Sequence, residues 1–416
     1  MASASFANLK DQTALDRLRT AQACLGSHDL EGAKLALEDA DRMLGGHAGS
    51  MSALASIATR QSNTKDALLW LDRLAATGLS RNVEKEESFA RLKSNPQFQS
   101  IATRLKANGD PIANATVAFR LSDPALLAED VVWDAPRHRF LISSVHEGKI
   151  IAVDPQGVAS DFVPAGAKDL WSIYGLAIDG KHNRLWATTA AGPEFANFQL
   201  ADSGRTALLG YDLKNGKQVA RFDLPPDGKR HVLGDLTVGA EGAVYVSESI
   251  GGGVYRLPGP KASALDTVLA PHFLGSPQMP ALTADGRSLV VADYPQGLFV
   301  IDLAGRGGHW LPKPHSLATT GIDGLYLYEN RLIGIQNGTS PHRVLEMQLA
   351  PDSTQVVTWH VLEQATPDLG EPNHGVVVDR DFYFIGNSGW DRVGDDGMLK
   401  TPSDAKAPVL LKLRLD

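Results

Sequence analysis

Acidic and imidazole side chains stand immediately before short apolar segments at several places in the second part of the chain. Glu129 and Asp130 precede one such segment, Asp323 lies in a second, and His374 precedes a third. Carboxylates that share a narrow space repel one another, and their burial is unfavourable unless something neutralises them. A divalent cation is the simplest partner, and it can polarise a carbonyl oxygen and lower the pKa of a bound water. Because these residues are far apart in the sequence, this chemistry requires a fold that brings them together.

The chain from residue 109 to residue 416 contains six similar units of short strands. Each unit has an apolar strand, a polar turn and a second strand, and the second strands are Phe140–Ser144, Leu185–Thr189, Val244–Glu248, Leu289–Asp293, Leu332–Gln336 and Phe382–Gly386. Repeats of roughly 40–60 residues with four short strands are typical of a β-propeller, so we predict an all-β propeller with six blades. A strand at 116–121 would pair with 409–415 and close the ring. The alternative, a β-sandwich, explains neither the repeat nor its length.

In a propeller, the residues before the innermost strands of all blades meet at one end of the central channel. The expected dipeptides are Glu129–Asp130, Tyr174–Gly175, Gly234–Asp235, Pro280–Ala281, Asp323–Gly324 and Asn373–His374. Glu129, Asp235 and Asp323 are the candidate metal ligands, and their carboxylates suit calcium, which prefers oxygen ligands. If His374 also reaches the ion, a transition metal becomes an alternative. Each acid also has a structural interpretation, since aspartates often accept hydrogen bonds from turn amides.

The same end of the channel offers groups for proton transfer and substrate contact. Asp323 and His374 are the candidate catalytic bases for an attacking water, because histidine titrates near neutral pH. Trp171, Tyr174 and Asn373 are candidates for substrate binding at the entrance. For the aromatic residues, packing within loops is an equally good interpretation, and for His374 the alternative is a hydrogen-bonded histidine in the channel wall.

Residues 1–108 differ in composition, with many Ala, Leu, Arg, Lys and Glu residues, and predict helices. Segments 33–38 and 67–72 superpose at an offset of 34 residues, which is the period of tetratricopeptide repeats. Asp29 and Asn63 are suitable helix caps, and Pro96 suits the first turn of a closing helix. We therefore expect an all-α tetratricopeptide-like array before the propeller, with a plain helical bundle as the alternative. So short an array would pack on the propeller, on a protein partner or on a second copy of the chain.

The composition limits the classes of partner and compartment. The chain has 416 residues and a net charge of −8, which argues against nucleic acid as a partner. Its single cysteine, Cys24, excludes an internal disulfide. No signal pattern opens the sequence, and no apolar run approaches about 18 residues, so we expect a soluble protein without membrane insertion. The cytoplasm is the expected compartment, or the periplasm or exterior if a signal peptide was removed.

At the channel mouth, the sequence resembles the superfamily of six-bladed propellers that includes the senescence-marker/gluconolactonase/luciferin-regenerating family, the paraoxonases and the strictosidine synthase-like proteins. Glu129 with the apolar segment 131–133 is similar to the first-blade glutamate ligand of that family, and Ile322–Leu325 is similar to its fifth-blade aspartate motif. The resemblance covers about residues 115–416. It implies one divalent cation, usually calcium, and hydrolysis of lactones or related esters, with Asp323 as both ligand and general base.

Two positions depart from the family pattern. Gly234 stands where an asparagine binds the metal, and Pro280 stands in a segment that lacks the usual asparagine ligand. The alternatives are a metal held differently, with Asp235 and Asn373 or His374 compensating, and a metal-free scaffold like that of the strictosidine synthase-like proteins.

Our first hypothesis is a metal-dependent hydrolase of a small-molecule lactone or ester. A second is a non-catalytic ligand-binding or scaffolding propeller whose helical part recruits a partner. A third is metal-free condensation or isomerisation at the same mouth. Fold resemblance alone does not decide among them, because one fold hosts many functions.

Overall fold

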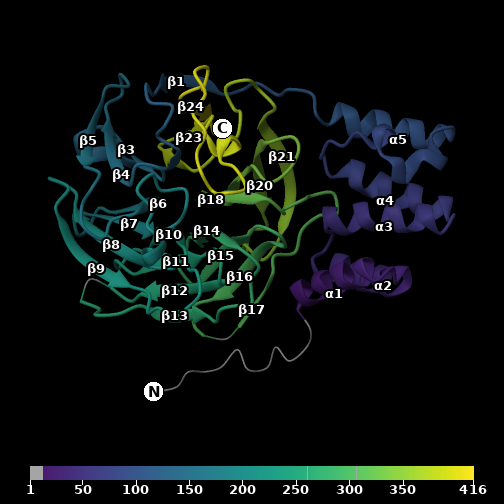
Figure 1. The fold of residues 1–416 in the computed structure, drawn as a ribbon, viewed down its shortest axis with the longest axis horizontal. Coiled ribbons are helices and arrows are strands. Elements are labelled where there is room, and N and C mark those ends of the chain that lie inside the picture. The colour runs from purple at the N-terminus through teal and green to yellow at the C-terminus, as the bar shows by residue number, and fades with distance from the viewer. Residues whose placement is uncertain (1–12, 260, 306) are drawn as a thin grey trace.

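The structure, a computed structural model, describes residues 13–259, 261–305 and 307–416 and shows a helical array beside a six-bladed propeller (Figure 1). The first 12 residues of the predicted helical part lie outside this description. The helices of the array are α1 Ala14–Gly26, α2 Leu30–Met43, α3 Ala48–Arg60, α4 Thr64–Ala76 and α5 Pro96–Ala107, with short 3-10 helices at η1 Val83–Lys85 and η2 Glu87–Leu92. An all-α segment followed by an all-β propeller is thus confirmed.

Helix caps and small apolar residues explain the array. The side chains of Asp29 and Asn63 accept the first free amides of α2 and α4, and Pro96 opens α5. Ala33 in α2 and Ala67 in α4, which are 34 residues apart, are both fully buried. The offset thus marks corresponding positions of two helices, while the tetratricopeptide character of the array stays a prediction.

Each blade of the propeller is a four-stranded antiparallel sheet. The strands of the first three blades are β2 Ala128–Asp134, β3 Arg139–Ser144, β4 Lys149–Val153, β5 Ala159–Val163; β6 Ser172–Asp179, β7 Arg184–Ala190, β8 Thr206–Asp212, β9 Gln218–Asp223; β10 Leu233–Val238, β11 Val244–Glu248, β12 Gly253–Leu257 and β13 Asp266–Leu269. The next two blades contain β14 Pro277–Leu282, β15 Ser288–Asp293, β16 Gly297–Asp302, β17 Gly307–Trp310; β18 Ile322–Tyr328, β19 Arg331–Gln336, β20 Arg343–Leu349 and β21 Val356–Gln364. Short 3-10 helices lie between strands at η3 Ala135–Arg137, η4 Leu200–Asp202 and η5 Trp390–Arg392.

The sixth blade closes the ring with strands from both ends of the propeller. Its order is β1-β24-β23-β22, with β1 Thr116–Arg120, β22 Gly375–Val378, β23 Asp381–Gly386 and β24 Val409–Arg414. Phe119 pairs with Leu410 and Arg120 with Val409, as the sequence predicted for these two segments. This pairing covers the edge of β24, which would otherwise expose unpaired backbone groups.

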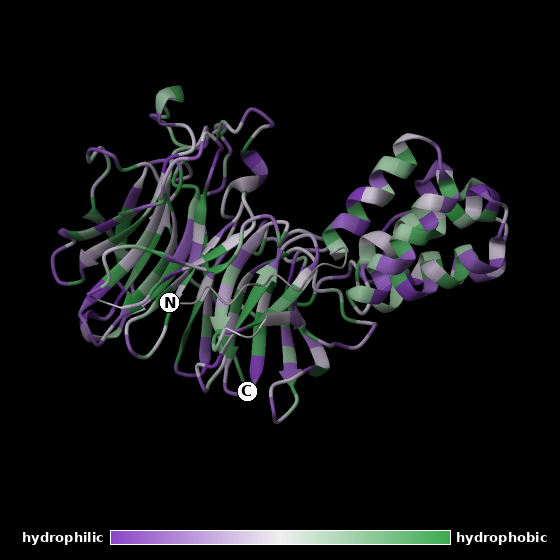
Figure 2. Ribbon diagram, turned by 90° about the horizontal axis from the view of Figure 1, so that it is seen from below, coloured by the Kyte–Doolittle hydropathy of each residue, from purple (hydrophilic) through white to green (hydrophobic). Residues whose placement is uncertain are grey.

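The helical array lies at one side of the propeller, against the loops of blades four and five (Figure 2). Arg343 is fully buried there, and its guanidinium donates to the carbonyl of Thr77 at 3.3 Å and to Gln336 Oε1 at 2.6 Å. Lys313 Nζ donates to the carbonyls of Gly45 and Gly46 at the end of α2. Cations that donate to backbone carbonyls of the array hold this contact in one geometry.

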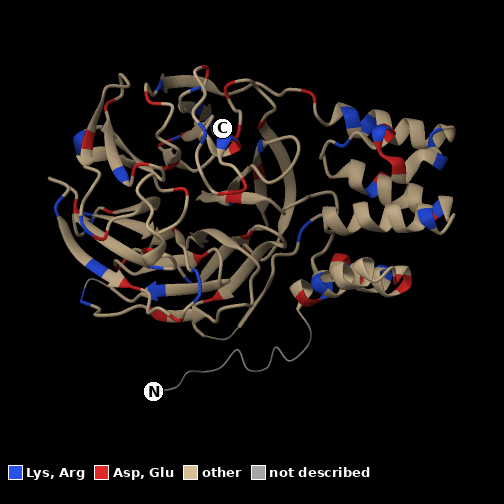
Figure 3. Cartoon of the chain, in the orientation of Figure 1, with Lys and Arg blue, Asp and Glu red and all other residues tan. Residues whose placement is uncertain are grey.

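Charged side chains are scattered over the outer strands, loops and helices rather than collected on one face (Figure 3). Among the described residues, no helix has the length and apolar character needed to cross a bilayer.

Candidate functional site

The innermost strands are irregular where they begin. In five blades the register with the second strand shifts there; β2, for example, pairs Ala128 with Ser144 and then Val131 with Ile142, so that Glu129 and Asp130 lie in a bulge. The corresponding shifts in the other four blades fall at 173–176, 233–236, 277–280 and 322–325. A β-bulge re-aims side chains, and here it presents one dipeptide of each strand to the channel.

Hydroxyl groups of the second strands fix the first three bulges. Ser143 Oγ accepts the amide of Asp130 at 3.0 Å and donates to the carbonyl of Tyr174 in the next blade at 2.6 Å. Thr188 and Ser247 occupy the same place in the second and third blades and make the equivalent contacts with their own bulges. These hydroxyls position the mouth residues through backbone contacts, and Thr188 also joins its blade to the next.

The fourth blade departs from the sequence prediction. We expected Pro280–Ala281 at the mouth, but Gln278 lines the mouth cavity, and Pro280 and Ala281 line a cavity at the opposite end of the channel. The bulge between Pro277 and Pro280 corresponds to the bulges of the other blades, and it puts residues 278–279 in the position for which 280–281 were expected. This blade therefore contributes an amide side chain to the mouth.

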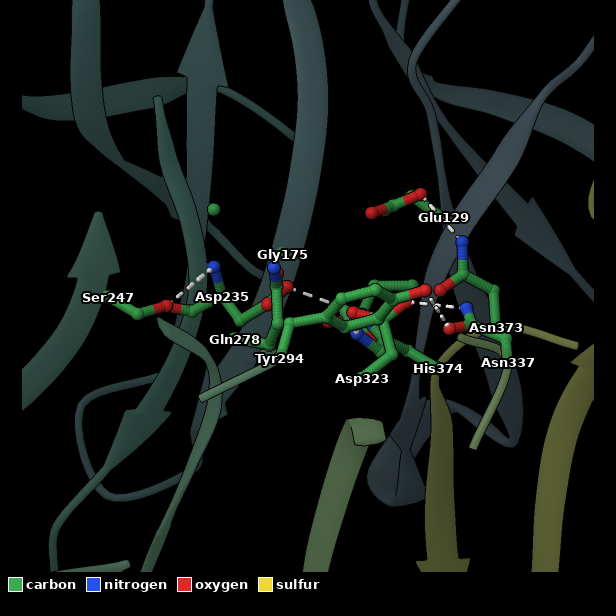
Figure 4. Close-up of polar contacts among 12 residues, drawn as sticks. Glu129, Gly175, Asp235, Ser247, Gln278, Tyr294, Asp323, Asn337, Asn373 and His374 are labelled. Atoms are coloured by element: carbon green, nitrogen blue, oxygen red, sulfur yellow. Dashed lines mark hydrogen bonds and ion pairs between the residues drawn. The ribbon is translucent and has the colours of Figure 1, made fainter. Parts of the chain in front are cut away.

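Three acidic residues and one histidine meet at the centre of the mouth (Figure 4). One ligand atom each from Glu129, Asp235 and His374 lies within 4.8 Å of the others, and all three side chains are buried. His374 Nδ1 lies 3.4 Å from Asp235 Oδ1, and Nε2 lies 3.6 Å from Asp323 Oδ1. We call Glu129, Asp235 and His374 the buried trio; Asp323 faces the other ring nitrogen of the imidazole.

Side-chain donors orient Glu129. Asn373 Nδ2 and the indole Nε1 of Trp390 donate to Glu129 Oε2, at 2.7 and 2.6 Å. Both donors reach the same oxygen, and Oε1 receives neither. Trp390 belongs to η5 in the loop between β23 and β24, so a segment far along the chain orients the carboxylate of the first blade.

A second chain of side chains orients Asp323. Asn337 Nδ2 donates to Asp323 Oδ2 at 2.7 Å and to the carbonyl of Pro372 at 3.1 Å. Tyr294 donates its hydroxyl proton to Asn337 Oδ1 at 3.0 Å. The Asp323 carboxylate is therefore held from one side by Asn337, while its Oδ1 faces His374.

The buried charges shift one another's protonation. The pKa of Glu129 is raised to about 8, mainly by burial; the His374 imidazole lowers it, and the carboxylates of Asp323 and Asp235 contribute to the rise. Burial likewise raises the pKa of Asp235 to about 7. Burial lowers the pKa of His374, but the carboxylates of Asp235 and Asp323 outweigh this and hold it well above its ordinary value. Within the part of the chain that the structure describes, the His374 imidazole is the basic group that faces Asp235 and Asp323, and its positive charge favours their ionised forms.

Among the described residues, some buried atoms of the mouth receive no hydrogen bond, although the two imidazole nitrogens lie at ion-pair distance from carboxylates. They are His374 Nδ1, His374 Nε2 and Asn373 Oδ1. Such atoms are rare in native proteins, and unpaired polar groups at a site suggest a ligand or ion. The trio and these atoms together offer oxygen and nitrogen donors that fit a divalent metal.

The mouth opens into a cavity of about 390 Å³. Glu129, Asp235, Asp323 and Tyr174 line this mouth cavity. Trp171, another expected contact residue, is buried and does not line the cavity; the guanidinium groups of Arg205 and Arg221 lie over its ring. Asn373 and His374 are nearly inaccessible beneath the carboxylates.

Other lining residues were missed by the sequence analysis. Ser249, Tyr294 and Asn337 each directly follow the second strand of their blade. That common position was a usable signal for the third, fourth and fifth blades, where the residue after the second strand lines the mouth cavity. Glu371 and Val393 come from long loops, for which the sequence pattern gives no such guide.

No protein-family model matches this sequence, and no curated protein matches it either. Solved structures that resemble it include a gluconolactonase from Xanthomonas campestris, with 18% identity, a TM-score of 0.47, and coverage of 74% of this chain and 99% of that one. A streptogramin B lyase shows 14% identity and a TM-score of 0.48, covering 73% of this chain and 98% of that one. The calcium-binding protein regucalcin from Agrobacterium tumefaciens shows 12% identity and a TM-score of 0.46, covering 71% and 93%. Because the identities are below 20% and the TM-scores are below 0.5, these similarities do not indicate the function of this chain.

Proposed function

We propose that this protein is a metal-dependent hydrolase that acts on a lactone or ester of a small molecule at the channel mouth. The observation that carries the proposal is the buried trio, whose ligand atoms lie within 4.8 Å of one another. Burying two carboxylates side by side is unfavourable without a cation, and a fold gains nothing from it unless the charges bind something.

The donor set also bears on the identity of the metal. Glu129 and Asp235 supply oxygens and His374 supplies nitrogen, with Asn373 Oδ1 unpartnered beside them. Calcium prefers oxygen ligands alone, whereas zinc, manganese and iron accept imidazole, so we propose a transition metal in place of the calcium expected from the sequence. When bound, such an ion polarises a carbonyl oxygen and lowers the pKa of water.

The exposure of Asp323 and His374 indicates which of them transfers a proton and which binds the metal. Asp323 lines the cavity and its side chain is 14% exposed, whereas the side chain of His374 is 1% exposed. We therefore assign proton transfer from water to Asp323 and metal binding to His374. Asn337 holds Asp323 Oδ2, which leaves Oδ1 to accept the proton. Gln278 and Tyr174 face the cavity from other blades and would orient the substrate.

A second candidate is metal-free acid–base catalysis, such as an isomerisation. It is favoured by one observation, that His374 lies between Asp235 and Asp323 at 3.4 and 3.6 Å. In that arrangement the imidazolium replaces the metal as the neutralising cation. The two candidates differ in whether the purified protein contains an ion.

The test is metal content by inductively coupled plasma mass spectrometry, on protein purified without chelator, together with a screen of lactones and esters. The double variant Glu129→Gln/Asp323→Asn is compared with Glu371→Gln, which removes a carboxylate from the cavity rim outside the trio. We expect about one transition metal per chain in the wild type and in Glu371→Gln, and none in the double variant. Hydrolysis of the lactone or ester is expected only in the two proteins that contain the metal. A metal-free wild type would overturn the proposal and favour the acid–base candidate.

A further inference from the structure

A second and larger cavity lies between the helical array and the propeller. This helix–propeller cavity has a volume of about 550 Å³, compared with about 390 Å³ for the mouth cavity. Tyr294 lines both cavities. Both volumes fall in the range of small-molecule sites.

Hydrogen bonds between the array and the propeller fix the walls of this cavity. His47 Nε2 lies 3.0 Å from the carbonyl of Pro295, and the amide of Ser80 donates to the carbonyl of Ser340 at 2.7 Å. All four residues line the cavity. The cavity is therefore preformed by contacts at both edges, and does not arise from loosely packed loops.

The two cavities meet at Tyr294, whose ring is placed against glycine backbone. A Cβ atom at Gly338 would lie 2.4 Å from Tyr294 Cζ, so a side chain at this position would displace the ring. The amide of Gly321 donates to the carbonyl of Tyr294 at 2.7 Å. Through Asn337, the Tyr294 hydroxyl is also connected to Asp323. One residue thus contacts the larger cavity and the orienting group of the proposed base.

The charged side chain in the described lining of the helix–propeller cavity is already paired with an acid outside the lining. Arg81 is its cationic residue among those described, and its guanidinium is paired with Glu86 at 2.6 and 2.8 Å. Burial lowers the pKa of His47, which keeps this imidazole neutral at ordinary pH. The remaining lining consists of apolar side chains such as Leu74 and Leu79, together with hydroxyl groups.

We propose that the substrate of the mouth site carries an uncharged, apolar arm, and that this arm lies in the helix–propeller cavity beyond Tyr294. The inference rests on the proposed hydrolase function and adds a substrate class to it: a lactone or ester with an alkyl or aryl substituent, rather than a bare polyhydroxylated ring. It also gives the helical array a role, because Leu74, Leu79 and Ser52 of the array form one wall of the site.

The experiment uses the full chain and a series of γ-lactones whose alkyl substituent grows from methyl to octyl. Their kcat/KM values are measured beside the affinities, from calorimetry, of 2-alkyltetrahydrofurans of the same lengths, which lack the carbonyl and cannot be hydrolysed. Each methylene that enters an apolar cavity is worth about a fourfold gain. We expect both quantities to rise by about this factor per methylene until the cavity is filled.

Two variants fill the cavity from opposite walls. Thr339→Trp acts from the propeller and Ser52→Phe from the array, and Thr358→Trp on the exposed face of β21 is the matched control. For each filling variant, we expect the ratio of the octyl to the methyl compound, in kcat/KM and in affinity, to fall at least tenfold. The kcat/KM for the methyl lactone should stay unchanged in these variants, and all values should stay unchanged in the control.

The outcomes separate the two proposals. Hydrolysis that is independent of alkyl length, or unaffected by both filling variants, overturns the assignment of the cavity and leaves the hydrolase standing. Length-dependent binding that the filling variants abolish, without hydrolysis of any lactone, supports the cavity and overturns the hydrolase.

Discussion

The two ends of the central channel are lined by the same inner strands but by different chemistry. The mouth gathers Glu129, Asp235 and Asp323 around a cavity of about 390 Å³. The opposite end encloses a cavity of similar volume lined mainly by apolar residues such as Val132 and Ile178, with Asp130 as its acid among the described residues. Glu129 and Asp130 are neighbours in one bulge, yet Glu129 lines the mouth cavity and Asp130 lines the cavity at the other end.

The partners of these two acids explain the difference. Asp130 accepts the backbone amides of Val131 and Leu176, both at 2.7 Å, with one oxygen each. Glu129 accepts two side-chain donors on a single oxygen. Burial raises the pKa of Asp130 to about 6 and that of Glu129 to about 8. The Asp130 carboxylate, whose two oxygens both accept backbone amides, holds blades together. The Glu129 carboxylate has one oxygen that accepts neither of these donors and is therefore available to a ligand.

The largest effect is expected for Glu129→Gln. The amide keeps the size of the side chain but removes its charge, so we expect the bound metal to be lost and kcat/KM for the best lactone to fall by about 10²–10³-fold. Steady-state kinetics and metal content measure both. The chelator-treated variant should unfold at the temperature of the chelator-treated wild type or above it, since Glu129 is protonated there at neutral pH. Retained turnover in a folded variant would contradict the assignment of the mouth.

The pH dependence of stability is the next largest effect. In chelator-treated protein, the folded state keeps protons on Glu129 and Asp235 up to pH values near 8 and 7, while the unfolded chain releases them at the ordinary pKa values of 4.5 and 3.8. The resulting stability is fully present below those ordinary values and is lost as the pH rises through 7 and 8. We expect the free energy of unfolding to fall by several kcal/mol between pH 5 and pH 8.

Urea titrations at several pH values measure this slope. The raised pKa of His374 acts in the same direction above its ordinary value of 6.5. Glu129→Gln removes one of the titrating groups and should flatten the curve, and saturating metal should flatten it further by excluding the protons. A free energy that rises with pH in the chelator-treated wild type would contradict the burial of uncompensated acids at the mouth.

A smaller effect is expected from Trp390→Phe, which removes the indole donor to Glu129 Oε2 but keeps an aromatic ring. Residues that orient metal ligands typically contribute about 10–100-fold to affinity or activity, so we expect kcat/KM and metal affinity to fall by that factor together. The thermal midpoint of the metal-free variant should stay within a few degrees of the wild type. An unchanged metal affinity would show that Trp390 only packs over the mouth.

The sequence predicted the features that depend on repeated local patterns. The second strands, the ring closure by residues 116–121 and 409–415, and the helix caps at Asp29 and Asn63 follow from apolar periodicity and capping chemistry, and the structure confirms them. The placement of Glu129, Asp235 and Asp323 around one mouth follows from the same repeat.

Features that depend on bulges and long loops could not be predicted in the same way. Pro280 was expected at the mouth because the segment 279–282 was matched to the fourth-blade motif of the family, and the structure places Gln278 there instead. Trp390 reaches Glu129 from a loop in which no periodicity fixes the path of the chain. The helix–propeller cavity depends on how the helical array packs on the propeller. The sequence pattern of the array does not specify the propeller surface that it contacts, nor the reverse.

The smallest effect is expected for Asp130→Asn, the change that matches Glu129→Gln one residue away. The amide oxygen can still accept one of the two backbone amides, so we expect the metal to remain bound and kcat/KM to change by less than about threefold, while the unfolding free energy falls by about 1–2 kcal/mol. Equal losses of metal in Asp130→Asn and Glu129→Gln would show that both acids serve one ion. Glu129 and Asp130 would then both bind the same ion from one bulge, and the two ends of the channel would form one connected site.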